Sequence, residues 1–288
     1  MSPKVSVLVP AYRHERFVAK AIASIYSQTF TDFEVLVTDD GSADGSAELL
    51  LRLQVEYGFT LTLNPQNLGL IPSLNAMLAK AKGEYIALLA GDDVWLPEKL
   101  AEQVAYMDQH PDVGAHSGNV LRINAEGQFI ESASRSLRPA GDVQFSDFLR
   151  SKYYFPAPIC LLRRRALDAV AAFNPAFSYE DWPLWLSLSN AGWRLTRTAS
   201  VLGHYRIHGA NLHKNIEEME RQNYRILAQY QSHALYPAAL RAMQLRNFES
   251  ALEISSAEAA KRAGRAAQFK WRYLRGLIRM GWMRLCGR

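Results

Sequence analysis

Two acidic pairs stand in the first part of the chain, each a short distance after an apolar segment. The pairs are Asp39-Asp40 and Asp92-Asp93, and the segments cover residues 33–37 and 85–89. Apolar runs of this length are typical of buried strands. Because the carboxyl ends of parallel strands face the crevice in which open α/β sheets bind ligands, we expect the four carboxylates to share one site. Such a concentration of negative charge suits a divalent cation, Mn²⁺ or Mg²⁺, with the phosphates that accompany it.

The second pair offers a metal ion two carboxylates, but position 90 holds Ala90 where a further acid would help. A cation of this kind is often held by one or two carboxylates plus substrate phosphates, so Asp92 and Asp93 suffice as metal ligands. His208 is a candidate third ligand, and Arg206 is a candidate partner for a diphosphate. The alternatives are a surface histidine and an ordinary ion pair. For either acidic pair taken alone, the alternative is a carboxylate that caps the following helix.

A third acidic pair, Glu180-Asp181, opens a segment rich in tryptophan. Tryptophan rings suit the faces of sugars, and a carboxylate beside them suits general-base catalysis on a hydroxyl group. Glu180, Trp182 and Trp185 are therefore candidates for binding an acceptor. The alternative is a capping acid with an aromatic core behind it.

Composition and length are those of a globular protein. The chain has 288 residues, of which 49% are hydrophobic and 21% charged, enough for one large α/β domain or two small ones. Its two cysteines, Cys160 and Cys286, lie far apart, so we expect free thiols in a reducing compartment. We expect no signal peptide, and no apolar run approaches the roughly 20 residues that span a bilayer. The expected location is cytoplasmic, peripheral on the inner face of the cytoplasmic membrane.

The positive charge gathers in the last part of the chain. Residues 257–288 hold nine Lys or Arg against one acid, whereas the whole chain has a net charge of +5. From position 269 the tail is amphipathic, with Trp271 and Trp282 on an apolar face beside a stripe of arginines. This pattern favours an anionic membrane surface as the partner of residues 269–288. The alternatives are a helix docked on its own domain and a dimer contact; the motifs that accompany nucleic-acid binding are lacking.

Hydrophobic periodicity predicts the elements that must position these residues. Strands are expected at 5–9, 33–37, 60–63, 85–89 and 113–123, with an extended segment at 194–204. Helices are expected at 15–27, 47–57, 72–82 and 97–109, after Glu180, and from residue 216 onward with breaks near Pro237 and Ser255. Strands that alternate with helices imply parallel βαβ units with right-handed crossovers.

The predicted fold class is therefore α/β, a mostly parallel, Rossmann-like sheet flanked by helices, with a C-terminal helical extension. We expect a catalytic domain at 1–212, with a nucleotide-binding half at 1–110 and an acceptor half at 111–212. Residues 213–288 form the predicted helical region, which ends in the basic amphipathic tail 257–288.

Taken in order, the motifs resemble a family-2 glycosyltransferase with the A-type, nucleotide-diphospho-sugar-binding fold. The resemblance covers roughly residues 3–210. It rests on Val7-Leu8-Val9-Pro10-Ala11-Tyr12, Asp39-Asp40-Gly41-Ser42, Asn67-Leu68-Gly69, Gly83-Glu84-Tyr85-Ile86, Gly91-Asp92-Asp93-Val94-Trp95, Glu180-Asp181-Trp182 and Tyr205-Arg206-Ile207-His208.

The resemblance implies roles for individual residues. The residues that would line the pocket for the nucleotide base and ribose are Pro10, Ala11, Tyr12, Asp39 and Asp40. Asn67 and Asn75 would border the nucleotide and the donor sugar. Asp92 and Asp93 match the end of the family's metal-binding acidic motif, and Asp181 matches its catalytic base.

The activity that the resemblance implies is inverting transfer of a sugar from a UDP- or dTDP-sugar to a saccharide or a lipid-linked saccharide. The product would be a bacterial cell-surface polysaccharide, such as lipopolysaccharide, O-antigen or capsule. One alternative is a nucleotidyltransferase, although the Gly-rich loop usual after the first strand is replaced by Pro10-Ala11-Tyr12-Arg13-His14. The other is a non-catalytic scaffold of the same fold, although the acids that such a protein could lose are all present.

Overall fold

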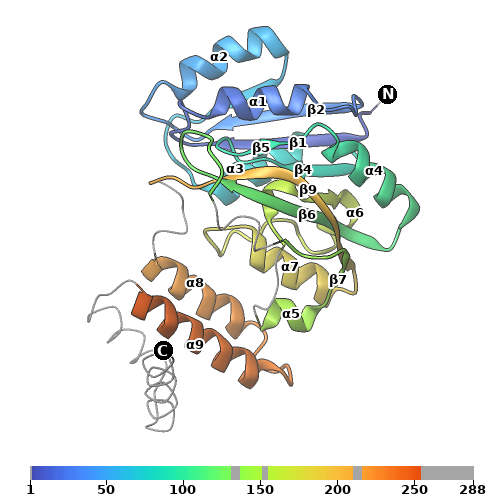
Figure 1. The fold of residues 1–288 in the computed structure, drawn as a ribbon, viewed down its shortest axis with the longest axis vertical. Helices are drawn as coiled ribbons and strands as arrows, with labels where there is room; N and C mark the ends of the chain where they lie inside the picture. Colours follow the sequence, from blue (N-terminus) through green and yellow to red (C-terminus); the bar gives the residue numbers. More distant parts are fainter. Residues whose placement is uncertain (1, 131–136, 151–154, 210–215, 254–288) are drawn as a thin grey trace, which may run out of the picture. The chain divides into compact units, whose positions relative to one another are not determined.

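The computed structural model describes residues 2–130, 137–150, 155–209 and 216–253 (Figure 1). The chain divides into two compact units. The first comprises Met1–Phe148 and Lys152–Gln222, and the second comprises Leu149–Ser151 and Asn223–Arg288. The first unit carries every candidate site residue named above. The basic tail 257–288 lies outside the described residues.

The first third of the chain forms parallel βαβ units, as predicted. Its elements are β1 (Val5–Ala11), α1 (Val18–Tyr26), β2 (Phe33–Asp39), α2 (Ser46–Tyr57), β3 (Thr60–Leu63), α3 (Leu70–Lys80) and β4 (Tyr85–Leu88). The strands lie in the order β3-β2-β1-β4, and each neighbouring pair is parallel. All four strands therefore end at the same edge of the sheet.

The second part of the first unit extends this sheet with strands of both directions. Its strands are β5 (Val94–Trp95), β6 (Val113–Ile123), β7 (Gly141–Val143), β8 (Leu161–Arg163) and β9 (Arg194–Arg206). Strand β8 runs antiparallel between β4 and β6, and β9 is parallel to β6. Short strands β5 and β7 pair antiparallel with β9. Within the described residues, β6 and β9 thus point the same way as β1 to β4, which confirms the α/β class with a mostly parallel sheet.

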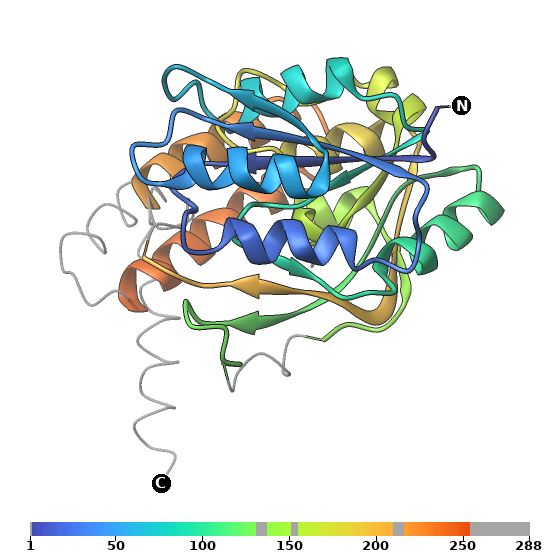
Figure 2. The ribbon, with the colours of Figure 1, turned by 90° about the horizontal axis from the view of Figure 1, so that it is seen from above.

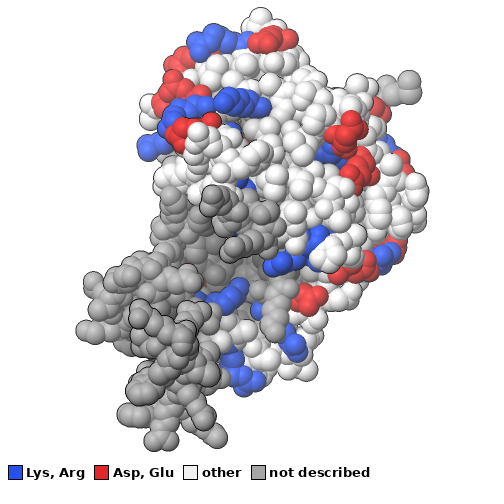
Figure 3. Space-filling view, in the orientation of Figure 1, with Lys and Arg blue, Asp and Glu red and all other residues white. Residues whose placement is uncertain are grey.

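Helices cover both faces of this sheet. Besides those named above, they are α4 (Lys99–Gln109), α5 (Phe145–Leu149), α6 (Arg164–Ala169) and α7 (Asp181–Asn190). Figure 2 shows α1 and α3 on opposite sides of β1. Lys, Arg, Asp and Glu side chains lie next to one another along the margin of the face drawn in Figure 3, so the two signs are interspersed there.

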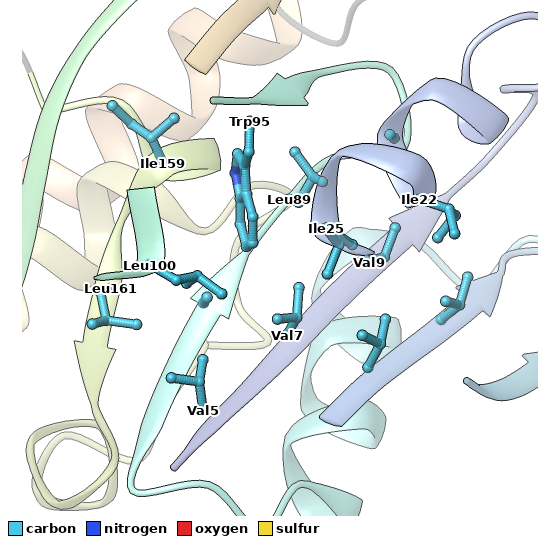
Figure 4. Close-up of a cluster of buried hydrophobic side chains, with 14 of the residues drawn as sticks. Val5, Val7, Val9, Ile22, Ile25, Leu89, Trp95, Leu100, Ile159 and Leu161 are labelled. Carbon is cyan, nitrogen blue, oxygen red and sulfur yellow. The ribbon is translucent and has the colours of Figure 1, made fainter. Parts of the chain in front are cut away.

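The main hydrophobic core packs between the sheet and α1, α2 and α4 (Figure 4). Val5, Val7 and Val9 are fully buried in it, as the two-residue period of a strand requires. Ile22 and Ile25 of α1 pack against the same face with the three-residue step of a helix. The short apolar run of β1 and the helical spacing of apolar residues in α1 are the patterns from which the sequence predicts these two elements.

Some helix boundaries differ from the prediction by two or three residues. Helix α1 begins at Val18 rather than at residue 15, and α4 begins at Lys99 rather than at residue 97. Helix α3 begins at Leu70, so Pro72 lies within its first turn, and the helix ends at Lys80. A Cβ atom at Gly83 would lie 2.4 Å from the backbone nitrogen of Ser6, so the glycine is there because β1 passes too close for a side chain.

The second unit is helical in its described part. Helix α8 (Ile216–Ala228) begins in the first unit, and α9 (Tyr236–Glu253) lies in the second. The predicted break near Pro237 is present, because α8 ends at Ala228 and α9 begins at Tyr236. Pro237 itself occupies the first turn of α9, where its missing N–H costs no hydrogen bond. Across the described residues, the helices fall short of the length and apolar character that crossing a membrane would need.

The core predicts a contrast between two identical substitutions. Val7→Ala removes buried methyl groups from β1 and should lower the free energy of unfolding by about 2–3 kcal/mol. Val55→Ala on α2, where the valine is 89% exposed, should change it by about 0.5 kcal/mol at most. Urea denaturation of both variants measures the difference. Equal losses would contradict the packing described here.

Candidate active site

The loops that follow the parallel strands are held together at one edge of the sheet by backbone hydrogen bonds. The amide of Asp40 donates to the carbonyl of Ala11 at 2.8 Å, and the amide of Gly91 donates to that of Pro10 at 3.1 Å. The amide of Asn64 donates to the carbonyl of Asp39 at 2.9 Å. The strand pairing thus continues past the strand ends, and the loops after β1, β2, β3 and β4 meet there.

The first acidic pair divides into two different roles. Both oxygens of Asp40 are used: Oδ1 accepts from Asn64 Nδ2 at 2.8 Å and from the Leu68 amide at 2.9 Å, and Oδ2 accepts from the Gly69 amide at 2.8 Å. Asp40 therefore holds the loop before α3 against the sheet. Its contacts do not favour the nucleotide-binding role expected for it.

Asp39, in contrast, uses only one of its two carboxylate oxygens in a hydrogen bond within the described residues. Its Oδ2 accepts from the Ser42 amide at 3.0 Å, whereas its Oδ1 has no hydrogen-bond partner among the described residues. The side chain is only 2% exposed. Gly41 between these residues has a positive φ of 68°, and a Cβ there would lie 2.4 Å from the backbone of Gln66. The close approach of the two loops thus requires glycine and leaves Asp39 as the member of the pair that a ligand can use.

The other residues expected around the nucleotide lie near this edge. Pro10 and Ala11 end β1, and Tyr12 after them is 37% exposed. Asn67 is exposed in the loop that Asp40 holds. Asn75 on α3 donates through Nδ2 to the carbonyl of Phe173 at 2.8 Å, which ties α3 to a later loop.

Asp92 lies between two histidines. Its Oδ2 is 2.8 Å from His208 Nε2 and 3.8 Å from His14 Nε2. One ligand atom from each residue can be chosen so that all three lie within 4.8 Å of one another. Burial acts to raise the pKa of Asp92, but the hydrogen bond from His208 and the charge of His14 outweigh it, so this pKa lies below its ordinary value. The predicted ligands Asp92 and His208 are therefore brought together.

Asp93 points to a different partner. Its Oδ1 accepts from the Arg206 amide at 2.8 Å, and its Oδ2 has no hydrogen-bond partner among the described residues. Burial and then the charge of Asp92 raise the pKa of Asp93 well above its ordinary value. Asp93 thus lies beside the Asp92–histidine cluster without being part of it.

Arg206 is 2% exposed, and its guanidinium group is committed to backbone carbonyls. Its Nε donates to the carbonyl of Asp92 at 2.8 Å, and its Nη1 donates to those of Asn124 at 3.1 Å and Ala125 at 3.3 Å. These contacts hold the acidic loop to β9 and to the loop after β6. They favour a structural role over the predicted contact with a diphosphate.

The third acidic pair stands at the N-terminus of α7. Asp181 is the first residue of the helix, and its Oδ1 accepts from the Trp182 amide. Burial raises the pKa of Asp181, although this hydrogen bond opposes the change. Burial and then the charge of Asp181 raise the pKa of Glu180 to about 7. A carboxylate with a raised pKa is a better proton acceptor, as a general base requires.

The pKa of Tyr205 is affected by carboxylates of both the second and the third acidic pair. Burial raises its pKa, and the charges of Asp93, Asp92 and Asp181 raise it further. Asp93 also contacts β9 directly, because it accepts a hydrogen bond from the amide of Arg206, the residue after Tyr205. The second acidic pair therefore lies beside the strand that carries Tyr205.

Trp182 and Trp185 are corrected by the structure. Trp182 is 4% exposed and donates through Nε1 to the carbonyl of Phe148 at 2.8 Å. Trp185 is fully buried and meets Phe155 edge to face, with ring centroids 4.9 Å apart. Neither ring offers a face to a sugar. The alternative interpretation, an aromatic core behind the acids, is what the structure shows.

His14 is the residue that the sequence analysis did not select. It follows β1 closely, and the cue was present in the missing acid at Ala90 together with a histidine beside the end of a central strand. Chain position alone did not show that the loops after β1 and β4 touch. That contact comes from the parallel pairing of the two strands.

Comparison with known proteins shows that this chain is similar to glycosyltransferases. The model of glycosyl transferase family 2 matches residues 6–171. EpsE of Bacillus subtilis, named as a glycosyltransferase, is 39% identical over 197 residues, which are 67% of this chain and 69% of EpsE. A protein of Nostoc, also named as a glycosyltransferase, is 30% identical over 219 residues, which are 73% of this chain and 66% of that protein. The chain thus spans about two thirds of the length of these relatives.

A third relative carries a more specific name. WfaP of Escherichia coli, a UDP-Glc:α-D-GlcNAc-diphosphoundecaprenol β-1,3-glucosyltransferase, is 26% identical over 223 residues, which are 76% of this chain and 84% of WfaP.

Two solved structures share the fold. Residues 1–349 of Staphylococcus aureus TarS, in complex with UDP-GlcNAc, give a TM-score of 0.66 at 18% identity, covering 90% of this chain and 79% of that one. The mannosyltransferase PcManGT of Pyrobaculum calidifontis, in complex with GDP-Man and Mn²⁺, gives 0.63 at 21% identity, covering 93% and 80%.

The split between Asp39 and Asp40 predicts different effects of the same substitution. Asp40→Asn places an amide group against two N–H donors and should lower the free energy of unfolding by about 2–3 kcal/mol. The Leu68 and Gly69 amides should then exchange hydrogen faster. Asp39→Asn loses at most one hydrogen bond and should cost about 1 kcal/mol or less. Urea denaturation measures the loss of stability in both variants, and hydrogen exchange measures the protection of the two amides. Unchanged protection of the Leu68 and Gly69 amides in Asp40→Asn would refute the role of Asp40 in holding this loop.

Proposed function

Because the chain belongs to glycosyl transferase family 2, we propose that it transfers a sugar from a nucleotide-diphospho-sugar to an acceptor hydroxyl group, with inversion at the anomeric carbon. The observation that carries the proposal is the cluster of His14, Asp92 and His208 at the edge of the sheet where the loops after β1, β2 and β4 meet. Asp181, whose charge acts on Tyr205 together with those of Asp93 and Asp92, is the candidate base.

The nucleotide end of the donor fits the loops after β1 and β2. Asp39 Oδ1 is a buried acceptor without a partner among the described residues, and an unpaired buried acceptor gains a hydrogen bond when a ligand N–H or hydroxyl reaches it. Pro10, Ala11 and Tyr12 would border the base. Asn67 and Asn75 would lie toward the donor sugar. We propose a UDP- or dTDP-sugar as the donor, and UDP is the first nucleotide to test because WfaP is named for UDP-Glc.

The donor atoms of Asp92 and His208 fit a divalent cation, Mn²⁺ or Mg²⁺, because a carboxylate and an imidazole lie 2.8 Å apart in a buried place. Asp93 Oδ2 is a further oxygen at the same loop. Such a cation supplies neutralisation of the charge that develops on the leaving diphosphate. Arg206 supports this loop by holding the Asp92 carbonyl.

Asp181 would act on the acceptor. It takes the proton from the acceptor hydroxyl as that oxygen forms a bond to the anomeric carbon and the bond from that carbon to the diphosphate oxygen breaks. A single displacement inverts the configuration. Glu180, beside Asp181 at the start of α7, would contact the acceptor.

The relatives support a proposal for the biological setting. WfaP is named for a lipid-linked saccharide acceptor, which supports a saccharide or a lipid-linked saccharide as the acceptor here. We place the enzyme in cell-surface polysaccharide synthesis, such as lipopolysaccharide, O-antigen or capsule, peripheral to the cytoplasmic face of the membrane.

Asp181→Asn tests the base. The variant should lose about 10²–10⁴-fold in transfer rate, because an amide cannot accept the proton, while binding UDP as the native chain does. In the native enzyme the rate should fall with decreasing pH below the raised pKa of Asp181, at a pH above the ordinary value of about 4. Release of UDP from a panel of UDP-sugars with a diphosphate-linked lipid acceptor measures both.

Glu180→Gln is the matched control for the pH profile. It replaces the carboxyl group beside Asp181 with a neutral amide, and because burial is what raises the pKa of Asp181, the acidic limb of the profile should stay in place if Asp181 is the base. Near-native turnover of folded Asp181→Asn would refute the base. If the native chain binds UDP but transfers no sugar from any donor, a non-catalytic scaffold of the same fold is the better description.

Substitutions in the basic tail test whether it binds an anionic membrane surface. Changing Arg272, Arg275 and Arg279 to Gln should weaken binding to phosphatidylglycerol vesicles by up to about a hundredfold, since each basic residue near an anionic surface contributes on the order of 1 kcal/mol. Vesicle sedimentation measures the bound fraction. The control changes three exposed basic residues of the first unit, Lys20, Arg52 and Lys82, to Gln. Equal binding by the two triple variants would remove the tail as the membrane contact.

A further inference from the structure

His14 has no role in the proposed mechanism, yet its imidazole ring is largely buried beside Asp92. Its side chain is 17% exposed, and its Nδ1 atom is buried without a hydrogen-bond partner among the described residues. Its nearest charged neighbour is Asp92, 3.8 Å from Nε2. A buried histidine that serves only the fold is normally hydrogen-bonded, because an unpaired polar atom is costly to bury. His14 therefore needs another explanation.

The backbone holds His14 at this place from three directions. Its amide donates to Ser46 Oγ at 2.9 Å, and its carbonyl accepts from the amides of Phe17 and Val18, each at 2.8 Å. Gly91 makes room for the ring, since a Cβ atom there would lie 2.7 Å from His14 Nδ1. The loop after β1, the start of α1 and the glycine before Asp92 all set the position of this imidazole.

The geometry around Asp92 suits one ion with three protein ligands. Ligands at about 2.1 Å from an octahedral ion stand about 3.0 Å apart when adjacent and about 4.2 Å apart when opposite. The contacts of Asp92 Oδ2 with the two histidines measure 2.8 and 3.8 Å, and the three ligand atoms lie within 4.8 Å of one another. His14 is thus within reach of an ion held by Asp92 and His208.

We propose that His14 is a direct ligand of the divalent cation and takes the place of the acid that is missing at Ala90. The inference rests on the cation site of the proposed function. Two imidazoles and one carboxylate favour a transition-metal ion over Mg²⁺, which prefers oxygen ligands and keeps its water. The site therefore selects Mn²⁺ over Mg²⁺, and His14 is what makes it selective.

The test uses Mn²⁺ as the probe on the full chain. Electron paramagnetic resonance of free Mn²⁺ gives the affinity, and electron spin echo envelope modulation counts the nitrogen atoms bound to the ion. The native chain should show two imidazole nitrogens. His14→Ala should show one and bind Mn²⁺ at least about tenfold more weakly. Mg²⁺ should displace Mn²⁺ from the native chain only when present in large excess.

Two further variants test the same ligand without simply removing the side chain of His14. His14→Asp restores an acid and should shift the preference toward Mg²⁺ by roughly tenfold. Gly91→Ala keeps His14 but pushes its ring away, so it should also lose one nitrogen. The control is His110→Ala, at the far end of α4, where the ring bonds to the carbonyl of Tyr106. Circular dichroism and thermal unfolding confirm that each variant is folded.

The outcomes separate this inference from the proposed function. If Asp92→Asn loses Mn²⁺ while His14→Ala binds it as the native chain does, with unchanged nitrogen modulation, His14 is not a ligand and the cation site itself remains. If the native chain binds Mn²⁺ through two nitrogens but transfers no sugar, the inference stands and the proposed function fails. Failure of the native chain to bind Mn²⁺, with or without UDP, would overturn the inference.

Discussion

The whole site depends on parallel pairing of the central strand β1 with β2 on one side and β4 on the other. Hydrogen bonds from Asp40 and Gly91 to the carbonyls of Ala11 and Pro10 extend this pairing beyond the strand ends. Parallel strands end at the same edge, so their loops must meet there. The acidic pairs after β2 and β4 are thus brought together by the backbone, before any side chain makes a contact.

A cluster of buried carboxylates is costly unless each is paired, and the acids of this site are paired to different degrees. Asp40 is satisfied by two amides and Asn64, and Asp92 is satisfied by His208. Asp39 and Asp93 each keep one buried oxygen without a hydrogen-bond partner in the described part of the chain. Asp40, which is fully paired, holds a loop in place, whereas the proposed function supplies a nucleotide for Asp39 and a cation for the loop that carries Asp92 and Asp93.

Local patterns in the sequence were enough for most of the fold. Alternation in Val5, Val7 and Val9 and the three-residue steps of α1 reflect interactions with one face of a sheet, and such periodicity is visible in the chain itself. The position of Asp39 and Asp92 after strands placed both at the carboxyl edge for the same reason. The edge strands β5 and β7 were not predicted, because segments of two and three residues carry no period.

The sequence by itself determined the α/β class, the order in which strands and helices follow one another along the chain, and the presence of acids at strand ends, because these follow from local patterns. Only the tertiary structure decided that Asp40 is fully hydrogen-bonded whereas Asp39 keeps one unpaired oxygen among the described residues, that Trp185 is core, that Arg206 binds carbonyls, and that His14 lies beside Asp92. These outcomes depend on which segments approach one another and on the direction of each side chain. Both are set by non-local packing, which leaves no trace at a single position of the sequence.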